Sequence, residues 1–152
     1  MTDQTAAEQI DRVRRRRAEL RESIGDMELA LAQAAHGREA EWTVLVRERC
    51  AHLEDDFAIH LEVAEAPTGL HAQVLADAPY LAPQVNRLQR DHAGISKQFT
   101  EVHGLLDPPE GDVDVDAVRL CLTDLIGLLV RHRQRGADLL WDAYATSLGG
   151  ET

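Results

Sequence analysis

Three of the seven histidines in this chain fall on apolar helical stripes, where an imidazole would have no water to bind. They are His60, His92 and His132, and each belongs to a different stretch of the chain. A single histidine in such a position is usually satisfied by a backbone carbonyl. Three that face one interior would cost about 1–3 kcal/mol each if their ring nitrogens stayed unpaired. The pattern therefore predicts a shared partner for the three imidazoles, and histidine is the commonest metal ligand.

Carboxylates that could complete such a site are few. Glu65 follows His60 by five residues and is rotated from it by about 140° on an ideal helix, but its long side chain can lean inward. Glu62 and Asp138 have a less favourable helical phase. Imidazole together with carboxylate suits iron, manganese or zinc. The sequence thus predicts a site for one of these metals, built from the three histidines and Glu65.

The elements that must position these residues are helices. Apolar residues recur at steps of three and four, and no segment alternates as a strand does. Gly and Pro mark breaks near residues 37, 67–69 and 107–112, so helices are expected at about 5–35, 39–66, 79–106 and 113–148, with a short one across 70–78. The pattern predicts a single-domain, all-α, up-down-up-down four-helix bundle with a short extra helix between helices two and three.

The depth of the histidines in this bundle is consistent with one site. His92 lies about 14 residues before the end of the third helix, and His132 about 19 residues after the start of the fourth. Across an antiparallel turn they fall within roughly one helical turn of each other. The short helix before residue 79 lets the third helix shift along the second, which brings His60 within reach as well.

These features resemble the hemerythrin-like, or HHE-type, family of cation-binding domains. The resemblance rests on FAIHLEVAE (57–65) before a Pro-Gly turn, LQRDHAGI (88–95) and LVRHRQRGADLL (129–140), and it covers about residues 10–144. It implies a four-helix bundle that holds two non-haem irons. His60, His92 and His132 match the family's histidines on helices two, three and four, and Glu65 matches an acidic residue that follows the helix-two histidine.

Three positions depart from the family's ligand pattern. Arg17 stands at the position of the helix-one histidine, and Ala64 and Gly136 stand at two carboxylate positions. An arginine that points inward would replace the charge of a metal ion and would seek Glu65 or Asp138. One that points outward would lie along the surface with its charge in water.

Composition excludes several classes of partner. The formal net charge of −11 argues against a general nucleic-acid or anionic-membrane binder. The run Arg14–Arg17 is a local exception; it is typical of a solvated helix face, and a phosphate-binding patch is the alternative. Cys50 and Cys121 lie far apart, outside any CxxC motif, and are expected to be buried thiols. Residues 1–17 contain no apolar signal segment, so we expect a cytoplasmic protein.

Two functions are the main candidates for this sequence, and an anion-binding or catalytic pocket that uses Arg17 and the histidines, or a pH-sensing bundle, stays open beside them. The first is a metal-binding bundle that holds non-haem iron, manganese or zinc and binds a small ligand such as oxygen, peroxide or nitric oxide. The second is a metal-free bundle of the same fold that acts as an interaction or regulatory module. Its support is the departures at the ligand positions and a C-terminal stretch with Trp141, Tyr144 and Leu148, suited to pack on a partner or a second copy of the chain. The sequence assigns no catalytic residue.

Overall fold

The computed structural model describes the backbone of residues 3–149 and the side chains of residues 6–145. Over this range the chain is helical and contains no strand. The helices are α1 (Asp3–Ala32), α2 (Glu39–Glu65), α3 (Leu70–Asp77), α4 (Ala82–Leu106) and α5 (Val115–Gly149), with a 3-10 turn at Pro79–Leu81. The predicted all-α class is confirmed.

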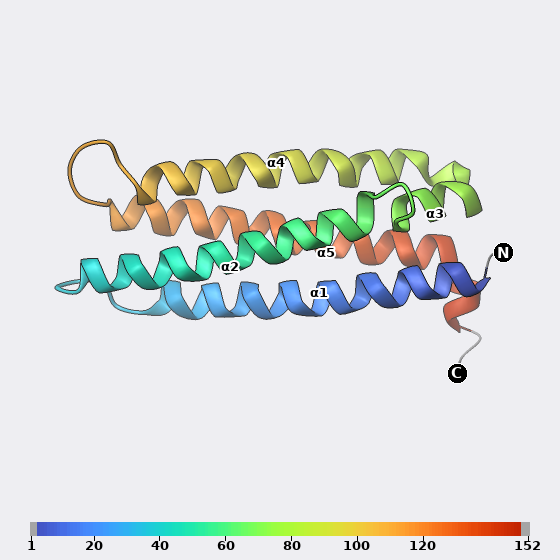
Figure 1. Ribbon diagram of the computed structural model, residues 1–152, viewed down its shortest axis with the longest axis horizontal. Coiled ribbons are helices and arrows are strands. Elements are labelled where there is room, and N and C mark those ends of the chain that lie inside the picture. The colour runs from blue at the N-terminus through green and yellow to red at the C-terminus, as the bar shows by residue number, and fades with distance from the viewer. Residues whose placement is uncertain (1–2, 150–152) are drawn as a thin grey trace.

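The four long helices lie side by side as a bundle in which successive helices run in opposite directions (Figure 1). α1 packs along α2, and α4 packs along α5. The connections α1–α2 and α4–α5 lie at one end, and α3 lies at the other (Figure 1). The up-down-up-down arrangement with a short helix between the second and third long helices is confirmed. None of the described helices combines the length and apolar character needed to cross a membrane.

Helix boundaries differ from the predicted ones at three places. α1 ends at Ala32 rather than near residue 35, and the chain turns back through Gly37, whose φ of 75° favours glycine. Residues 79–81 form a 3-10 turn rather than the first turn of α4. α5 begins at Val115 rather than near residue 113, because the Oδ1 atom of Asp114 accepts a hydrogen bond of 3.1 Å from the Ala117 N–H and caps the helix.

The turn between α2 and α3 is tight and depends on glycine. A Cβ atom at Gly69 would lie 2.5 Å from the carbonyl oxygen of Val63, so only glycine fits there. The amide Nε2 of Gln9 donates a 2.6 Å hydrogen bond to the carbonyl of Thr68, which ties the turn to α1. This turn fixes where α3 begins, and with it the position of His71.

One polar layer divides the apolar core into two clusters. The cluster toward the α1–α2 and α4–α5 connections, called here the loop-side core, includes Leu53, Leu122 and Leu125, all fully buried. The second cluster lies toward α3 and includes Val74, Val85 and Leu139. Both free cysteines are buried, as predicted.

Candidate metal centre

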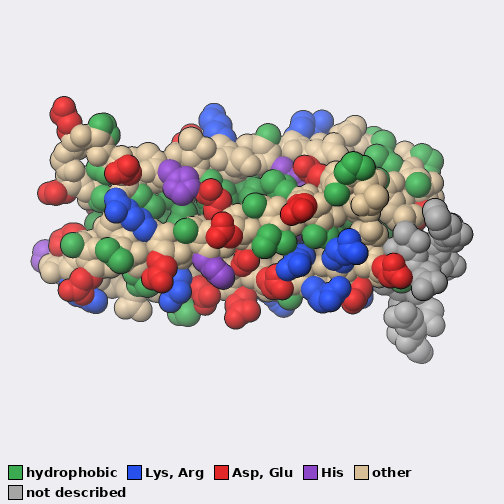
Figure 2. All heavy atoms as spheres, in the orientation of Figure 1, with side chains coloured by type: hydrophobic (Ala, Val, Ile, Leu, Met, Phe, Trp, Pro, Cys, Tyr) green, Lys and Arg blue, Asp and Glu red, His purple; other side chains and the backbone are tan. Residues whose placement is uncertain are grey.

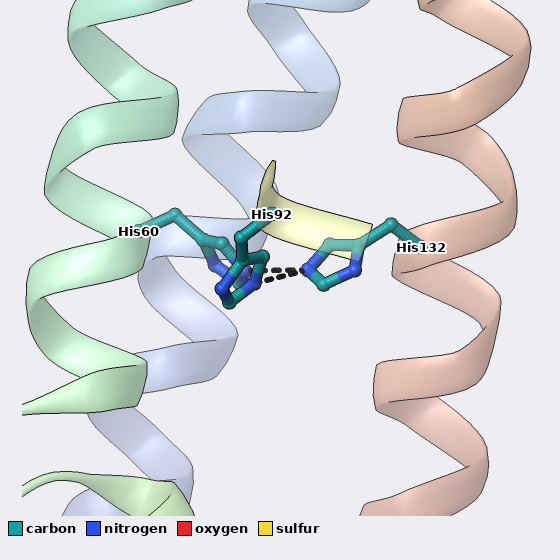
Figure 3. A group of neighbouring side chains, drawn as sticks. All are labelled: His60, His92 and His132. Atoms are coloured by element: carbon teal, nitrogen blue, oxygen red, sulfur yellow. Dashed lines mark hydrogen bonds between the residues drawn. The ribbon is translucent and has the colours of Figure 1, made fainter. Parts of the chain in front are cut away.

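Each long helix has a basic side chain that interrupts its apolar stripe, and these interruptions lie together. In α1 the interruption is Arg17, and in α2, α4 and α5 it is His60, His92 and His132. The three imidazoles point toward one another from three helices (Figure 3). One nitrogen from each lies within 4.8 Å of the other two, and each residue is at most 7% exposed. We call these three residues the histidine cluster.

The nitrogens that meet are all Nε2 atoms. Nε2 of His132 lies 2.8 Å from Nε2 of His92 and 3.2 Å from Nε2 of His60. The ring of His60 is close to perpendicular to the other two, with interplanar angles of 86° to His132 and 88° to His92, and the planes of His92 and His132 meet at 65°. Three ring nitrogens therefore converge on one point, as the ligands of a single ion do.

Two carboxylates hold the outer nitrogens of this cluster. Nδ1 of His92 contacts the carboxylate of Glu65, and Nδ1 of His132 lies 3.4 Å from that of Asp91. Asp91 also accepts a 2.6 Å hydrogen bond from Nη1 of Arg135. Since an ionised carboxylate only accepts, the proton of each neutral ring belongs on Nδ1. The Nε2 atoms of His92 and His132 then present lone pairs to each other.

Burial keeps these imidazoles neutral. It lowers the pKa of His60 to about 3 and the pKa values of His92 and His132 to about 4, and His60 and His132 are lowered further by the neighbouring rings. Burial alone would raise the pKa of Asp91, but its hydrogen bonds with Arg135 and His132 lower that pKa instead. At neutral pH each ring is therefore uncharged, and neutral imidazole is the form that binds metals.

A fourth histidine, His71 from α3, adjoins the cluster. It is 5% exposed, and its ring stacks on that of His92 with centroids 6.0 Å apart and planes 8° from parallel. Its Nδ1 atom is buried without a hydrogen-bond partner, as is Nδ1 of His60. Sequence reasoning missed His71 because α3 is too short to show a stripe. The signal that could have found it is its place two residues after Gly69.

The predicted carboxylates take up different positions. Glu65 contacts the outer nitrogen of His92 and is not among the residues whose ligand atoms converge. Glu62 and Asp138 are exposed, and Asp138 accepts a hydrogen bond of 3.1 Å from Gln134. Asp91, which the sequence did not single out, faces His132 instead. Its place directly before His92 carries no periodicity that would reveal this contact.

A small cavity lies between the histidine cluster and α1. Its volume is about 20 Å³, which is room for one water-sized molecule. Ala64 and Gly136 line it, so two positions where the resemblance expects carboxylates provide space instead of oxygen ligands. Among the described side chains, the residues fit one ion held by three histidines and do not supply the ligands of a second one.

Arg17 forms another part of the cavity wall. It is half-buried, and its Nη2 donates a 3.1 Å hydrogen bond to the backbone carbonyl of Arg133. Neither Glu65 nor Asp138 is within ion-pair distance, so the expectation that an inward arginine would seek one of them is wrong. Arg17 instead binds the backbone carbonyl of Arg133 on α5, which lies closer to it than either carboxylate.

Comparison with known proteins adds no relative: no protein family model, no curated protein and no solved structure matches this chain.

Proposed function

We propose that this chain is a hemerythrin-like bundle that binds one divalent metal ion between His60, His92 and His132 and presents it to a small ligand. The observation that carries the proposal is the convergence of three Nε2 atoms, two of which face each other at 2.8 Å. Lone pairs at that separation repel unless a cation lies between them. Burial disfavours an extra proton on either ring, and the carboxylates at Nδ1 favour placing each ring's own proton there, so a metal ion is the better partner for the facing Nε2 atoms.

The donor set narrows the choice of metal. Neutral imidazole nitrogens suit zinc, copper, iron and nickel, whereas manganese prefers oxygen ligands. No carboxylate of the described residues is among the converging ligand atoms. Of the metals that the sequence suggested, non-haem iron and zinc therefore fit better than manganese.

The residues around the cluster favour a metal ion that binds a small ligand over a metal ion with a purely structural role. Three protein ligands leave coordination positions open, as in sites where a metal handles substrate or water. A bound ion would supply Lewis acidity and, if it is iron, an electron for a ligand such as oxygen, peroxide or nitric oxide. The adjoining cavity of about 20 Å³ admits only a molecule of that size.

Other side chains prepare the site. Glu65 and Asp91 hold His92 and His132 in the Nδ1-protonated tautomer, which aims Nε2 at the shared point. Val13, Leu88 and Leu139 line the cavity with apolar surface and exclude bulk water. Such carboxylate-backed histidines are a common feature of metal sites.

The direct test is metal content. Protein purified without an affinity tag or chelator is analysed for bound metal, and the metal-free form is then titrated with Fe²⁺ under anaerobic conditions and with Zn²⁺. We expect one ion per chain. A His60→Ala, His92→Ala double variant is expected to retain only background metal.

The matched control removes two histidines outside the cluster. His52 and His103 are exposed on the surface, so a His52→Ala, His103→Ala variant should bind metal as the parent chain does. Adding nitric oxide to the iron-loaded protein and recording its electron paramagnetic resonance spectrum then tests for an open position. Equal metal loss in both double variants, or no metal in the folded parent chain, would refute the proposal.

A metal-free interaction module is the second candidate. The observation that favours it is Trp141, which is 61% exposed near the end of α5. Tyr144 in the same stretch is buried, and the side chain of Leu148 lies outside the described residues. This candidate gains support if the folded chain binds no metal and if Trp141→Ser abolishes self-association or partner binding.

A further inference from the structure

Four arginines line a pocket on the surface between α1 and α5. Arg14, Arg17 and Arg21 lie at steps of three and four on α1 and so share one face of that helix. Arg133 reaches the same pocket from α5. The pocket has a volume of about 260 Å³, and among the side chains that the structure describes its one other lining residue is Ala18. No carboxylate of residues 6–145 contributes to its wall.

These arginines stay unpaired in an acidic protein. Of the described side chains, no carboxylate lies within ion-pair distance of any of the four, although the chain carries 27 acidic residues against 16 basic ones. Neighbouring arginines do find partners: Arg15 lies 3.8 Å from Asp11, and Arg16 lies 3.0 Å from Glu19. Figure 2 shows Lys and Arg side chains gathered over the N-terminal half of α1, with carboxylates spread along the bundle.

Arg17 gives a second indication that the pocket lacks a partner. Burial lowers the pKa of Arg17, and Arg133, Arg14 and Arg21 lower it further by repulsion. Its Nε atom is buried without an acceptor, although Nη2 donates to a carbonyl. A buried N–H of a charged group that lacks an acceptor costs stability. An anion in the pocket would relieve the repulsion and supply acceptor oxygens.

The geometry points to a binding site for a tetrahedral oxyanion of the phosphate type, and we propose that the pocket of Arg14, Arg17, Arg21 and Arg133 binds one. Guanidinium groups match the oxygens of phosphate in pairs. At about 260 Å³ the pocket is smaller than sites for drug-sized ligands, which start near 300 Å³. The ligand is therefore either free phosphate or the phosphoryl end of a larger molecule whose remainder stays outside.

This site does not depend on the proposed metal function. Arg17 lines both the pocket and the histidine cavity, but none of the four arginines is a proposed metal ligand. Metal-free protein is therefore expected to bind phosphate, and so is the His60→Ala, His92→Ala variant. Failure of one proposal leaves the other standing.

The test is calorimetric titration of the full chain with inorganic phosphate in a low-salt buffer free of other oxyanions. The pocket variant is Arg14→Gln with Arg21→Gln, because glutamine keeps helix propensity while it removes the charge and the paired guanidinium donors. The matched control is Arg15→Gln with Arg16→Gln, which makes the same charge change on the same helix outside the pocket. We expect the pocket variant to bind phosphate about 10-fold more weakly or worse, and the control to change by less than about 2-fold.

Further ligands identify the source of the phosphate group. Titration with adenosine monophosphate is compared with inorganic phosphate: tighter binding of the nucleotide assigns the phosphoryl end of a larger molecule, and tighter binding of phosphate assigns the free ion. Equal weakening in the two double variants would mean that only general charge attraction operates and would overturn the proposal. Absence of binding at millimolar phosphate in the folded parent chain would overturn it too.

Discussion

The loop-side core and the histidine cluster are built on the same helices and the same three-four periodicity, yet they treat buried side chains in opposite ways. In the loop-side core, Leu53, Leu122 and Leu125 are fully buried among apolar neighbours. Burial of each such side chain stabilises the fold by about 1.5–3 kcal/mol. In the histidine cluster, burial instead leaves some ring nitrogens without a hydrogen-bond partner and others facing one another.

The difference teaches where this bundle gives up stability. A layer of leucines at the four positions would close the core, whereas an arginine and three histidines bury polar groups that a ligand must satisfy. Such a layer destabilises the ligand-free protein, and a ligand that binds to the folded state restores the stability, as expected of a binding site. The loop-side core then serves as the rigid support that keeps three helices in register.

The largest expected effect comes from converting the cluster into core. His132→Leu removes the nitrogen that both other histidines approach, so metal affinity should fall by more than the roughly 100-fold that loss of an outer-shell group can cost. The melting temperature of the metal-free protein should stay equal or rise, because an apolar side chain replaces a buried polar one. Chelator competition and thermal unfolding check the two halves. A metal-free variant that melts well below the parent would show that the histidines hold the fold.

The complementary change creates a defect in the loop-side core. Leu122→Ala leaves a cavity among fully buried neighbours and should lower the free energy of unfolding by about 2–5 kcal/mol. Urea unfolding of the metal-free protein measures this loss. The folded variant should still bind metal with the affinity of the parent chain. Loss of metal from folded Leu122→Ala protein would contradict the separation of support and site.

Acid should destabilise the metal-free protein through the buried imidazoles. The pKa of His60 is about 3 and those of His71, His92 and His132 are about 4 when folded, against about 6.5 when unfolded. The unfolded chain therefore binds more protons between these values, and stability present above pH 6.5 is lost as the pH falls toward 4.

This pH dependence can be measured and assigned. Each histidine contributes at most about 1.4 kcal/mol per pH unit. The charged groups near the imidazoles are Glu65, Asp91, Arg17, Arg133 and Arg135. The urea concentration at half-unfolding should decrease from pH 7.5 to 6 and again to 5. The decrease should be smaller for His132→Leu, which has one buried imidazole fewer. A parent midpoint that is flat over this interval would contradict the buried, neutral state of the rings.

Sequence periodicity predicted the bundle and the three-histidine layer because both follow from one rule, that stripe positions face the interior. His60, His92 and His132 occupy stripe positions, so their meeting required only that the helices pack antiparallel. Helix ends were predicted less well, since capping by Asp114 and the 3-10 turn at 79–81 depend on local hydrogen bonds.

The residues that surround the histidine cluster could not be predicted from periodicity. Asp91 and Arg135 meet across the α4–α5 contact, which depends on the rotation of each helix and not on spacing in one of them. His71 reaches His92 because Gly69 lets α3 start against the end of α2. The pocket arginines combine a step of three and four on α1 with a residue on α5. Contacts between helices therefore determine what periodicity within one helix leaves open.

The smallest expected effect concerns the outer carboxylates and decides the role of Glu65. If Glu65 holds the tautomer of His92, Glu65→Gln should weaken metal binding by about 10–100-fold, and Asp91→Asn should act similarly on His132. The matched control is Glu62→Gln, an exposed position on the same helix with the same charge change, which should alter affinity by less than about 2-fold. Chelator competition measures all three. If Glu65→Gln loses as much metal affinity as His132→Leu, Glu65 is a direct ligand, as the sequence suggested. If it loses no more than Glu62→Gln, the contact between Glu65 and His92 is only a surface ion pair. The ring of His92 would then be held in place by packing alone, as the leucines of the loop-side core are, and only His132 would keep a carboxylate that orients it.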